Sequence, residues 1–456
     1  MKKFGVSIFI LILLFSTTTF ASGDRVSLGY IYNSYKSHTE IMDDTNGNIN
    51  TVSPTCFDLT SSGHLEINNI FDQEFVNEMH ERGVLVTPFL SNHWGRKRAQ
   101  NALNKPEVLA DEIVEAIEKY NLDGVNVDLE NLTANDKDRL TNFVRVLREK
   151  LGDSKIISVA VASNPNKLQK TWVAAYDYAG LAEYADYLVL MAYDEHSAGG
   201  SAGPVASINF VSNSIEVMLE EVSRDKIVLG MPLYGRVWGE GKDYGGEAII
   251  LSQIERIAKR YNAVAIFDEV TGTPTITIDV ESGDHKAYVN GKYLEEGRYT
   301  IWYENEKSFS KKLELMNEFG LKGAALWALD NESSDFWNWY EKGFNVENYE
   351  SEEAANERAY YEYQRAYYEY VEMLIENTEP LKLNGKIELK NSKIKVKKVD
   401  ISVLMQTKII EDLKIEKVSF PALNQNAEKV IVANEYAKRT VKVSNNHHIK
   451  RYEKTY

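Results

Sequence analysis

Two carboxylates and an amide share one side of the stretch 124–130, which reads Gly-Val-Asn-Val-Asp-Leu-Glu. Its polar residues are Asn126, Asp128 and Glu130, and an apolar residue stands between each of them. Successive side chains of an extended strand point to opposite faces, so the three polar groups lie on the same face. A solvated edge strand would show this alternation too, but the flanking pattern described below predicts a strand buried on both faces. Polar groups buried in this way are costly unless a site uses them.

Asp128 and Glu130 stand close enough to act on each other. Side chains at positions i and i+2 of a strand are about 7 Å apart at Cα, so two carboxylates can share a proton and one pKa then rises. A glutamic acid with a raised pKa can act as a general acid near neutral pH. The sequence shows no Ser-His-Asp arrangement, no His pair at metal-ligand spacing and no phosphate loop, and its single cysteine, Cys56, excludes a cysteine-based metal site. Among reactions that use carboxylates without a metal or cofactor, glycoside hydrolysis is the leading candidate.

The elements that would position these residues alternate between strand-like and helix-like stretches. Strands are expected at 26–32, 52–59, 83–90, 124–130, 155–162, 187–193, 226–233 and 322–327. Helices are expected at 73–82, 106–120, 136–151, 210–223 and 308–319. This α/β alternation predicts a parallel sheet with helical crossovers, and eight strands favour a (β/α)8 TIM barrel. A doubly wound open sheet is the main competitor, but no glycine-rich phosphate loop follows the first strand.

Polar and aromatic residues follow the carboxyl ends of five of these strands, where barrels carry their functional groups. They are Asn92, His93 and Trp94, then Asp128 and Glu130, then Tyr193, Asp194, Glu195 and His196, then Tyr234 and Arg236, and finally Trp327. This coincidence supports the barrel. Between the seventh and eighth strands, at about 238–306, alternating runs with Gly and Pro predict a small α+β insertion that would form a wall of the cleft.

The stretch 123–130 resembles the signature of the family 18 glycoside hydrolases, Asp-x-x-Asp-x-Asp-x-Glu on the fourth barrel strand. Here it reads Asp-x-x-Asn-x-Asp-x-Glu. The similarity covers residues 24–345, and its further parts are Gly29-Tyr30, Met191-x-Tyr193-Asp194, Tyr234-Gly235-Arg236 and Trp327. The chain is most similar to the bacterial, chitinase-like branch that contains N-acetylglucosaminidases of spore-cortex peptidoglycan fragments. Those enzymes usually carry LysM modules, and we recognise none here.

The resemblance implies a retaining, substrate-assisted cleavage of β-1,4 bonds in N-acetylglucosamine-containing glycans, either peptidoglycan or chitin-type chains. Glu130 would protonate the glycosidic oxygen and later activate water, while the substrate's own 2-acetamido carbonyl would be the nucleophile. Asp128 would bind the acetamido N–H and Tyr193 the acetamido oxygen. The other expected substrate-binding residues are Trp327 as the floor of the subsite, Asp194, Met191, Tyr30, Arg236, Tyr234 and Trp94.

Asn126 stands where many chitinases of the family have an aspartate. An amide cannot take up or release a proton, so we expect Asn126 to hold Asp128 by an ordinary hydrogen bond. The consequence would be a shifted pH profile rather than a loss of activity. Asp123, at the start of the strand, is either a turn or cap residue or a functional one.

The first 21 residues have the composition of a secretory signal peptide. Lys2 and Lys3 precede an apolar run over residues 4–15, and small residues follow at Thr19 and Ala21. No other stretch resembles a membrane span, so we expect a protein without a transmembrane anchor that acts outside the cell, in the wall or on the spore. The net charge of −16 disfavours nucleic acid as a partner.

The chain changes character near residue 345. Residues 346–379 carry Arg-Ala-Tyr-Tyr-Glu-Tyr twice, at 358–363 and 365–370, which predicts a tyrosine-rich helix. A packed or coiled-coil helix is the favoured interpretation, and glycan contact by the tyrosines is the alternative. Residues 380–456 contain 17 Lys and Arg against 8 Asp and Glu and indicate a basic, β-rich domain. This domain would bind an anionic cell-wall or spore-surface polymer, unless its charges only protect strand edges from aggregation.

Two further classes of function compete with a glycosidase. One is a non-catalytic glycan-binding protein on the same barrel. The other is a surface-anchoring protein in which the C-terminal segments carry the biological role. The presence of Glu130 favours the enzyme, because a binding protein has no use for the acid.

Overall fold

The computed structural model describes residues 25–32, 34–241, 245–344, 428–434 and 438–444. The chain divides into two compact units at residue 350. The expected signal peptide over residues 1–21 and the tyrosine-rich segment at 346–379 lie outside the described residues, as does most of the basic region at 380–456.

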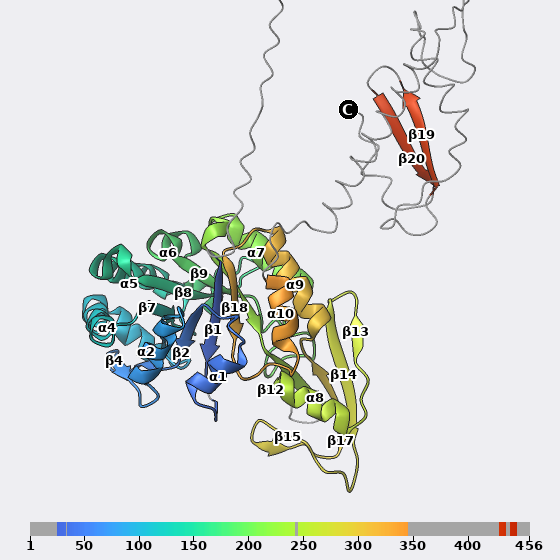
Figure 1. The fold of residues 1–456 in the computed structure, drawn as a ribbon, viewed down its shortest axis with the longest axis horizontal. Helices are drawn as coiled ribbons and strands as arrows, with labels where there is room; N and C mark the ends of the chain where they lie inside the picture. Colours follow the sequence, from blue (N-terminus) through green and yellow to red (C-terminus); the bar gives the residue numbers. More distant parts are fainter. Residues whose placement is uncertain (1–24, 33, 242–244, 345–427, 435–437, 445–456) are drawn as a thin grey trace, which may run out of the picture. The chain divides into compact units, whose positions relative to one another are not determined.

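Parallel strands form the centre of the first unit (Figure 1). They are β1 (Val26–Ile31), β2 (Thr51–Pro54), β3 (Phe57–Leu59), β5 (Leu85–Val86), β6 (Phe89–Ser91), β7 (Gly124–Asp128), β8 (Ile156–Ala162), β9 (Tyr187–Met191), β10 (Ile227–Pro232) and β18 (Gly323–Trp327). From β6 the parallel pairings run through β7, β8, β9, β10, β18 and β1 to β2. β2 also pairs with β5, and β3 pairs with β6.

Two of the expected strands are interrupted. The run at 52–59 is divided into β2 and β3, and the run at 83–90 is divided into β5 and β6. Between β2 and β3, Cys56 N–H donates to the Pro54 carbonyl at 2.9 Å, which turns the chain out of the regular ladder. Taking each divided run as one strand, the pairings pass through all eight expected positions and return to β1, as in a (β/α)8 barrel.

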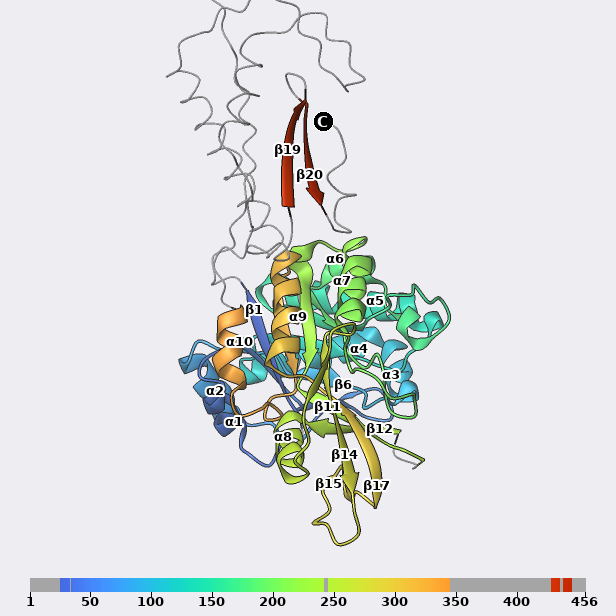
Figure 2. The ribbon, with the colours of Figure 1, turned by 90° about the vertical axis from the view of Figure 1, so that its right-hand side faces the viewer.

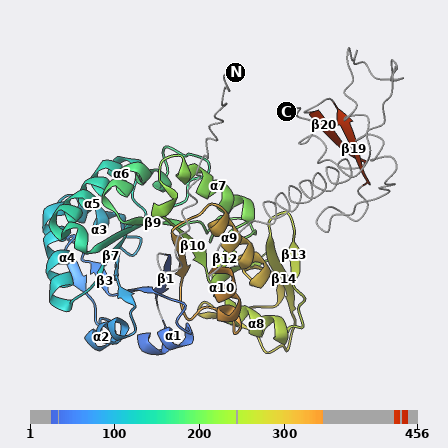
Figure 3. The same ribbon diagram turned by 45° about the horizontal axis from the view of Figure 1, so that its top comes forward.

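Helices surround the strands on the outside (Figure 3). They are α1 (His38–Asp44), α2 (Gln73–Glu81), α3 (Arg96–Leu103), α4 (Pro106–Tyr120), α5 (Lys137–Leu151), α6 (Tyr178–Tyr184), α7 (Ile208–Leu219), α9 (Glu306–Glu318) and α10 (Phe336–Phe344). The short strand β4 (Leu65–Ile67) pairs antiparallel with β3, and 3-10 turns lie at η2 (Ala134–Asp136), η3 (Gly152–Ser154), η4 (Trp172–Ala175) and η5 (Arg224–Lys226).

The alternation along β7 divides the core into two parts. Val125 and Val127 belong to the large outer cluster between strands and helices. The barrel interior holds a smaller cluster, which consists of Leu28, Tyr30, Phe89, Tyr187, Val189, Val228, Ala325 and Ala328. Position 124, the first of β7, requires glycine, because a Cβ there would lie 2.0 Å from the carbonyl oxygen of Ile156 on β8. The polar residues of β7 therefore point into the barrel, as the sequence predicted.

An α+β segment separates β10 from β18. Its elements are β11 (Tyr234–Gly239), β12 (Gly245–Ile250), α8 (Leu251–Arg260), β13 (Ile266–Asp268), β14 (Thr273–Val280), β15 (Tyr288–Val289), β16 (Lys292–Tyr293) and β17 (Gly297–Trp302). Five of the strands form an antiparallel sheet in the order β12-β11-β17-β14-β13, and β15 and β16 form a hairpin. Because the segment leaves the barrel at the carboxyl end of β10, it stands beside the mouth of the barrel (Figure 2).

In the second unit the described residues form one antiparallel pair. β19 (Glu428–Asn434) lies against β20 (Lys438–Ser444), with Glu428 opposite Ser444. Among the helices that the structure describes, none is both long and apolar enough to cross a membrane.

Candidate active site

The register of β7 brings its polar residues against specific partners on both neighbouring strands. Asn126 lies opposite Phe89 of β6 and Ser158 of β8, and Asp128 lies opposite Ser91 of β6. Asn126 is fully buried and Asp128 is 6% exposed. The amide therefore lies inside the barrel, and Asp128 lies one step nearer to the carboxyl ends of the strands.

Asn126 is held by two hydrogen bonds across the barrel. Its Nδ2 donates to Ser158 Oγ at 2.7 Å, and its Oδ1 accepts from Tyr30 Oη at 3.1 Å. The expected hydrogen bond from Asn126 to Asp128 was wrong: Asp128 Oδ1 is buried without a hydrogen-bond partner among the described residues. The amide of Asn126 is already bonded to Tyr30 and Ser158, so Asp128 Oδ1 is left buried and unpaired.

Glu130 is the second residue after Asp128, and its backbone is fixed from β6. Asn92 Nδ2 donates to the Glu130 carbonyl at 2.8 Å, and Asn92 Oδ1 accepts from Glu130 N–H at 2.9 Å. Tyr176 Oη donates to the carbonyl of Leu129 at 3.2 Å. These three bonds hold the chain at the end of β7, so the backbone that carries the Glu130 side chain has a defined position.

Burial raises the pKa of both carboxyl groups. Loss of solvent raises the pKa of Asp128 to about 7. Burial also raises the pKa of Glu130 well above its ordinary value, and the negative charges of Asp128 and Asp194 add to this. When Asp128 ionises first, Glu130 keeps its proton, and a protonated carboxyl group beside a carboxylate can serve as a general acid.

Asp194 follows β9 and is bound on two sides. Arg236 Nη2 donates to both carboxylate oxygens, at 2.7 and 2.8 Å, and Arg236 Nε donates to Oδ1 at 3.0 Å. Tyr234 Oη donates to the same Oδ1 at 2.5 Å. Asp194 has a φ of 61°, a left-handed conformation that non-glycine residues seldom adopt. Arg236 and Tyr234 thereby hold the Asp194 carboxylate in place. The negative charge of this carboxylate contributes to the raised pKa of Glu130.

Tyr193, directly before Asp194, keeps its hydroxyl proton. Burial raises the pKa of Tyr193 well above its ordinary value, and the surrounding Tyr234, Tyr30, Glu130 and Asp128 add to the shift. The ring of Tyr193 lies 6.3 Å from that of Tyr234 in an edge-to-face arrangement. Tyr193 is thus a neutral hydrogen-bond donor in the electrostatic surroundings of both carboxyl groups.

Trp327, at the end of β18, is the centre of a group of rings at the mouth of the barrel. Its ring lies 5.3 Å from Tyr30, 5.8 Å from Phe89 and 5.4 Å from Tyr32, and the contact with Tyr32 is stacked. The peptide bond between Trp327 and Ala328 is cis. Tyr30 also bonds Asn126, so this group of rings adjoins the polar residues of β7.

Two expected site residues lie apart from these contacts. Trp94 is 52% exposed and packs edge-to-face on Trp172 of η4 at 5.2 Å, and its carbonyl accepts from Asn131 Nδ2. Met191 packs against the outer core. Asp123 has a structural role at the opposite end of β7, where its Oδ2 accepts from Val86 N–H at 2.7 Å and lies 2.9 Å from His80 Nε2.

The sequence pointed to Asn92 only as one of several polar residues at strand ends, and it gave no indication of Ser158, Tyr32 or Tyr176. Ser158 lies within an apolar strand, where a hydroxyl is a weak signal. Its pairing with Asn126 depends on the register between β7 and β8, which the local pattern does not specify. Among the described residues no three His, Cys, Asp or Glu side chains are grouped so that they could hold a metal ion.

Comparison with known proteins identifies the family. Residues 95–332 match the model of the glycosyl hydrolases family 18. An uncharacterized glycosylase, YvbX, from Bacillus subtilis is 29% identical over 266 residues, which are 57% of this chain and 70% of that protein. The cortical fragment-lytic enzyme of Bacillus subtilis is 30% identical over 243 residues, which cover 52% of this chain and 53% of that protein. This chain thus spans about half the length of that relative.

Solved structures share the fold. The chitinase from Chromobacterium violaceum superposes with a TM-score of 0.63 at 24% identity, over 70% of this chain and 98% of that one. The spore cortex-lytic enzyme SleL of Bacillus cereus superposes with a TM-score of 0.62 at 18% identity, over 72% and 76% of the two chains.

Proposed function

The chain belongs to the glycosyl hydrolases of family 18 and is a glycosidase, and we propose that it cleaves β-1,4 bonds of N-acetylglucosamine-containing glycans with retention of configuration. The observation that carries this proposal is the pair of carboxyl groups at the end of β7. Glu130 has a pKa well above its ordinary value, beside the more readily ionised Asp128. That arrangement supplies a general acid near neutral pH.

Glu130 donates its proton to the glycosidic oxygen as the bond to the leaving sugar breaks. The same carboxylate then takes a proton from the water that attacks the anomeric carbon in the second step. The position of its backbone, fixed by the nitrogen and the oxygen of the Asn92 side-chain amide, supports this role. General acid catalysis requires such a fixed donor within hydrogen-bond reach of the oxygen.

The nucleophile is the carbonyl oxygen of the substrate's 2-acetamido group. The negative charges of two carboxylates, Asp128 and Asp194, act on Glu130. Asp128 lies on the same strand, and Asp194 is occupied by Arg236 and Tyr234. A mechanism in which the substrate supplies its own nucleophile is therefore favoured over a covalent glycosyl-enzyme.

Asp128 and Tyr193 position the acetamido group. The unpaired Oδ1 of Asp128 accepts the acetamido N–H, and the negative charge of this carboxylate stabilises the positively charged cyclic intermediate. Tyr193, neutral because burial raises its pKa, donates to the acetamido oxygen. Trp327 and its neighbouring rings form the apolar floor under the sugar.

Related proteins suggest the class of glycan and the location. The relatives named above include a cortical fragment-lytic enzyme, and the similar folds include a chitinase. We propose peptidoglycan, or its cortex fragments, and chitin-type chains as the candidate substrates. Together with the signal-peptide composition of residues 1–21, these relatives support a secreted enzyme that acts at the cell wall or the spore.

Product analysis tests the proposal. The mature protein is incubated in parallel with chitooligosaccharides and with glycan strands of peptidoglycan from which the stem peptides have been removed. The new reducing ends are identified by mass spectrometry. We expect new N-acetylglucosamine reducing ends with at least one of the two substrates. Binding of both glycans without any release of sugar would overturn the enzyme and favour the non-catalytic glycan-binding protein.

A further inference from the structure

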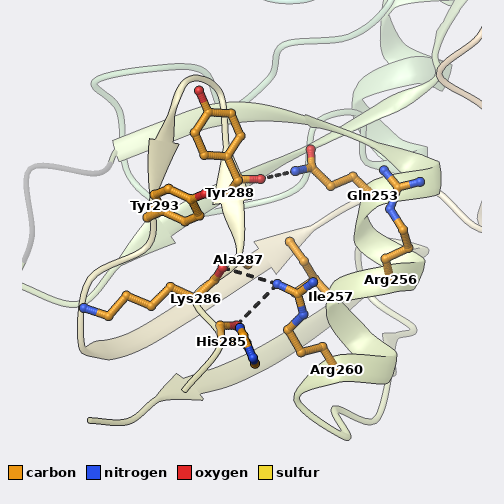
Figure 4. A pocket seen from close by; sticks show the side chains of 9 residues that line it. All are labelled: Gln253, Arg256, Ile257, Arg260, His285, Lys286, Ala287, Tyr288 and Tyr293. Carbon is orange, nitrogen blue, oxygen red and sulfur yellow. Dashed lines mark hydrogen bonds between the residues drawn. The ribbon is translucent and has the colours of Figure 1, made fainter. Parts of the chain in front are cut away.

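A basic pocket lies in the α+β segment, outside the candidate active site. It has a volume of about 350 Å³ and lies between helix α8 and the loop that leads into the hairpin of β15 and β16. Figure 4 shows the side chains that line it, which are Gln253, Arg256, Ile257, Arg260, His285, Lys286, Ala287, Tyr288 and Tyr293. The volume falls within the range in which proteins hold small ligands.

The lining is cationic. Among the nine lining residues are Arg256, Arg260 and Lys286, and there is no Asp or Glu. The side chains of Arg256 and Lys286 form no hydrogen bond or ion pair with any residue that the structure describes. In a chain with a net charge of −16, unpaired cations around one cavity make a local site for an anion.

The walls of the pocket are fixed before any ligand binds. Arg260 Nη1 donates to the carbonyls of His285 and Lys286, both at 3.3 Å, and Gln253 Nε2 donates to the carbonyl of Tyr288. Figure 4 shows these bonds between the helix and the loop. A site that is already ordered loses less conformational entropy when it binds.

Two tyrosines add flat surfaces beside the cations. Tyr288 and Tyr293 lie directly opposite each other in the hairpin, with ring centroids 5.0 Å apart in an edge-to-face arrangement. They are 52% and 65% exposed, so their faces are open to a ligand. Exposed aromatic rings contact the apolar faces of sugars, and neighbouring guanidinium groups bind carboxylates through paired hydrogen bonds.

We propose that this pocket binds a carboxylate-bearing sugar of the glycan, with Arg256 and Lys286 on the carboxylate and the two tyrosines on the sugar ring. The inference rests on the proposed function, and it names the substrate class. A carboxylate on the sugar distinguishes peptidoglycan strands without stem peptides, whose N-acetylmuramic acid residues carry a free one, from neutral chitin. The pocket would retain the polymer while the separate active site cleaves it.

Calorimetric titration of the full chain tests the pocket. The protein carries Glu130→Gln to prevent turnover, and the probes are the disaccharide of N-acetylglucosamine and N-acetylmuramic acid and the neutral disaccharide chitobiose. We expect tighter binding of the acidic disaccharide. In the variant Arg256→Ala/Lys286→Ala this preference should fall by about tenfold, as loss of about 1.4 kcal/mol of interaction requires.

Lys259→Ala is the matched control, because Lys259 is an exposed cation of α8 that does not line the pocket. It should retain the preference. No preference in the unsubstituted pocket, a preference that survives in the double variant, or an equal loss with Lys259→Ala would overturn the proposal. Inorganic phosphate that binds this pocket as tightly as the acidic disaccharide would also overturn it.

Failure of the proposed function has a different result. The wild-type chain could release no sugar from any N-acetylglucosamine glycan while the preference that depends on Arg256 and Lys286 remains. That result would contradict the glycosidase mechanism and support the pocket. If hydrolysis occurs and the preference is absent, the pocket falls and the mechanism stands.

Discussion

Burial raises the pKa of both Asp128 and Glu130, but neighbouring charges affect the two carboxyl groups differently. The negative charges of Asp128 and Asp194 also oppose the ionisation of Glu130, so its pKa rises further. Asp128 loses its proton near pH 7, while Glu130 keeps its own proton to higher pH. The active form therefore has an ionised Asp128 and a protonated Glu130, and activity should decline on both sides of that range.

Replacement of Glu130 by Gln removes the proton donor without changing its size. A general acid contributes roughly 10²- to 10⁴-fold to a rate, so we expect kcat on a chitooligosaccharide to fall by that factor. The far-UV circular dichroism spectrum should stay native. Glu118→Gln, an exposed change on α4, is the control and should keep full activity. Wild-type kcat in Glu130→Gln would exclude Glu130 as the acid.

Replacement of Asp128 by Asn removes a negative charge that raises the pKa of Glu130. The pKa of Glu130 should then decrease, so the alkaline limb of the kcat/KM profile should move to lower pH. Because the amide cannot stabilise a positive intermediate, kcat should fall as well. A profile of kcat/KM against pH measures both effects. An alkaline limb at the wild-type position would show that Asp128 does not act on the pKa of Glu130.

Replacement of Asn126 by Asp restores the aspartate typical of family 18. A second negative charge near Asp128 would raise the pKa of Asp128, so the acidic limb of the profile should move to higher pH, by on the order of one pH unit. Tyr30 and Ser158 can both donate to the new carboxylate, so activity should persist. An unchanged acidic limb would contradict this coupling.

At the scale of elements, the loop after β9 and the strand β11 are joined at one carboxylate. Arg236 binds Asp194 through both carboxylate oxygens, and 42 residues separate the two in sequence. Arg236→Lys keeps the charge but loses the paired geometry. We expect kcat/KM to fall by about tenfold, which corresponds to about 1.4 kcal/mol of lost transition-state stabilisation.

The chain offers a matched control for that change. Arg298 binds Asp279 through two bonds, at 2.9 and 3.0 Å, on the exposed surface of the same sheet. Arg298→Lys should leave kcat/KM unchanged, because neither Arg298 nor Asp279 forms a hydrogen bond with a described residue of the candidate site. Equal losses in the two variants would show that the Arg236 effect reflects the sheet rather than Asp194.

A buried ion pair stabilises helix α9 against the end of the α+β segment. Lys312 Nζ lies 2.7 Å from Glu304 Oε2, with side-chain exposures of 1% and 0%. Lys312→Met would leave a buried carboxylate without its cation, and breaking such a pair costs about 3–5 kcal/mol. Urea denaturation should show a decrease of this size in the free energy of unfolding.

Two further variants distinguish the effect of the buried charges from the effect of lost side-chain packing. Lys312→Met/Glu304→Leu removes both charges and should recover most of the lost stability. Lys307→Met, at an exposed pair with Glu269, should cost less than about 1 kcal/mol. A loss in Lys312→Met as small as that in Lys307→Met would show that the buried pair adds no more than a surface pair.

The sequence predicted the elements well because their signals are local. Apolar runs of strand length and helical periodicity placed α4 at Pro106–Tyr120 and β8 at Ile156–Ala162, within a residue of the structure. The position of Asn126 and Asp128 inside the barrel followed from their alternation together with the pattern of the flanking strands. What the sequence missed depends on contacts between distant segments. The breaks between β2 and β3 and between β5 and β6 lie inside continuous apolar runs.

The partners of the site residues were missed for the same reason. Asn126 was expected on Asp128, two residues away, but it bonds Tyr30 and Ser158, which are 96 and 32 residues away. Nothing in the sequence indicated that Arg236 binds Asp194, which is 42 residues away. Each of these pairings depends on strand register around the barrel, which is set only when the whole ring is assembled.

At the scale of the whole molecule, the contacts that build the candidate site among the described residues all lie in the first unit, which ends at residue 349. Deletion of residues 350–456 should therefore leave hydrolysis of soluble chitooligosaccharides unchanged. Residues 380–456 carry an excess of nine positive charges, so we propose that they bind an anionic wall polymer. Pelleting with purified cell walls should show weaker retention of the shortened chain at low salt, with the difference reduced at high salt. Equal retention of both chains at low salt would rule out this role.

The anomeric form of the first product tests the account most directly. Proton NMR during the first minutes of chitooligosaccharide hydrolysis distinguishes the two anomers before they interconvert. A mechanism in which Glu130 donates the proton and the 2-acetamido group attacks predicts that the β-anomer forms first. An initial α-anomer would contradict it, because water would then have attacked the anomeric carbon directly.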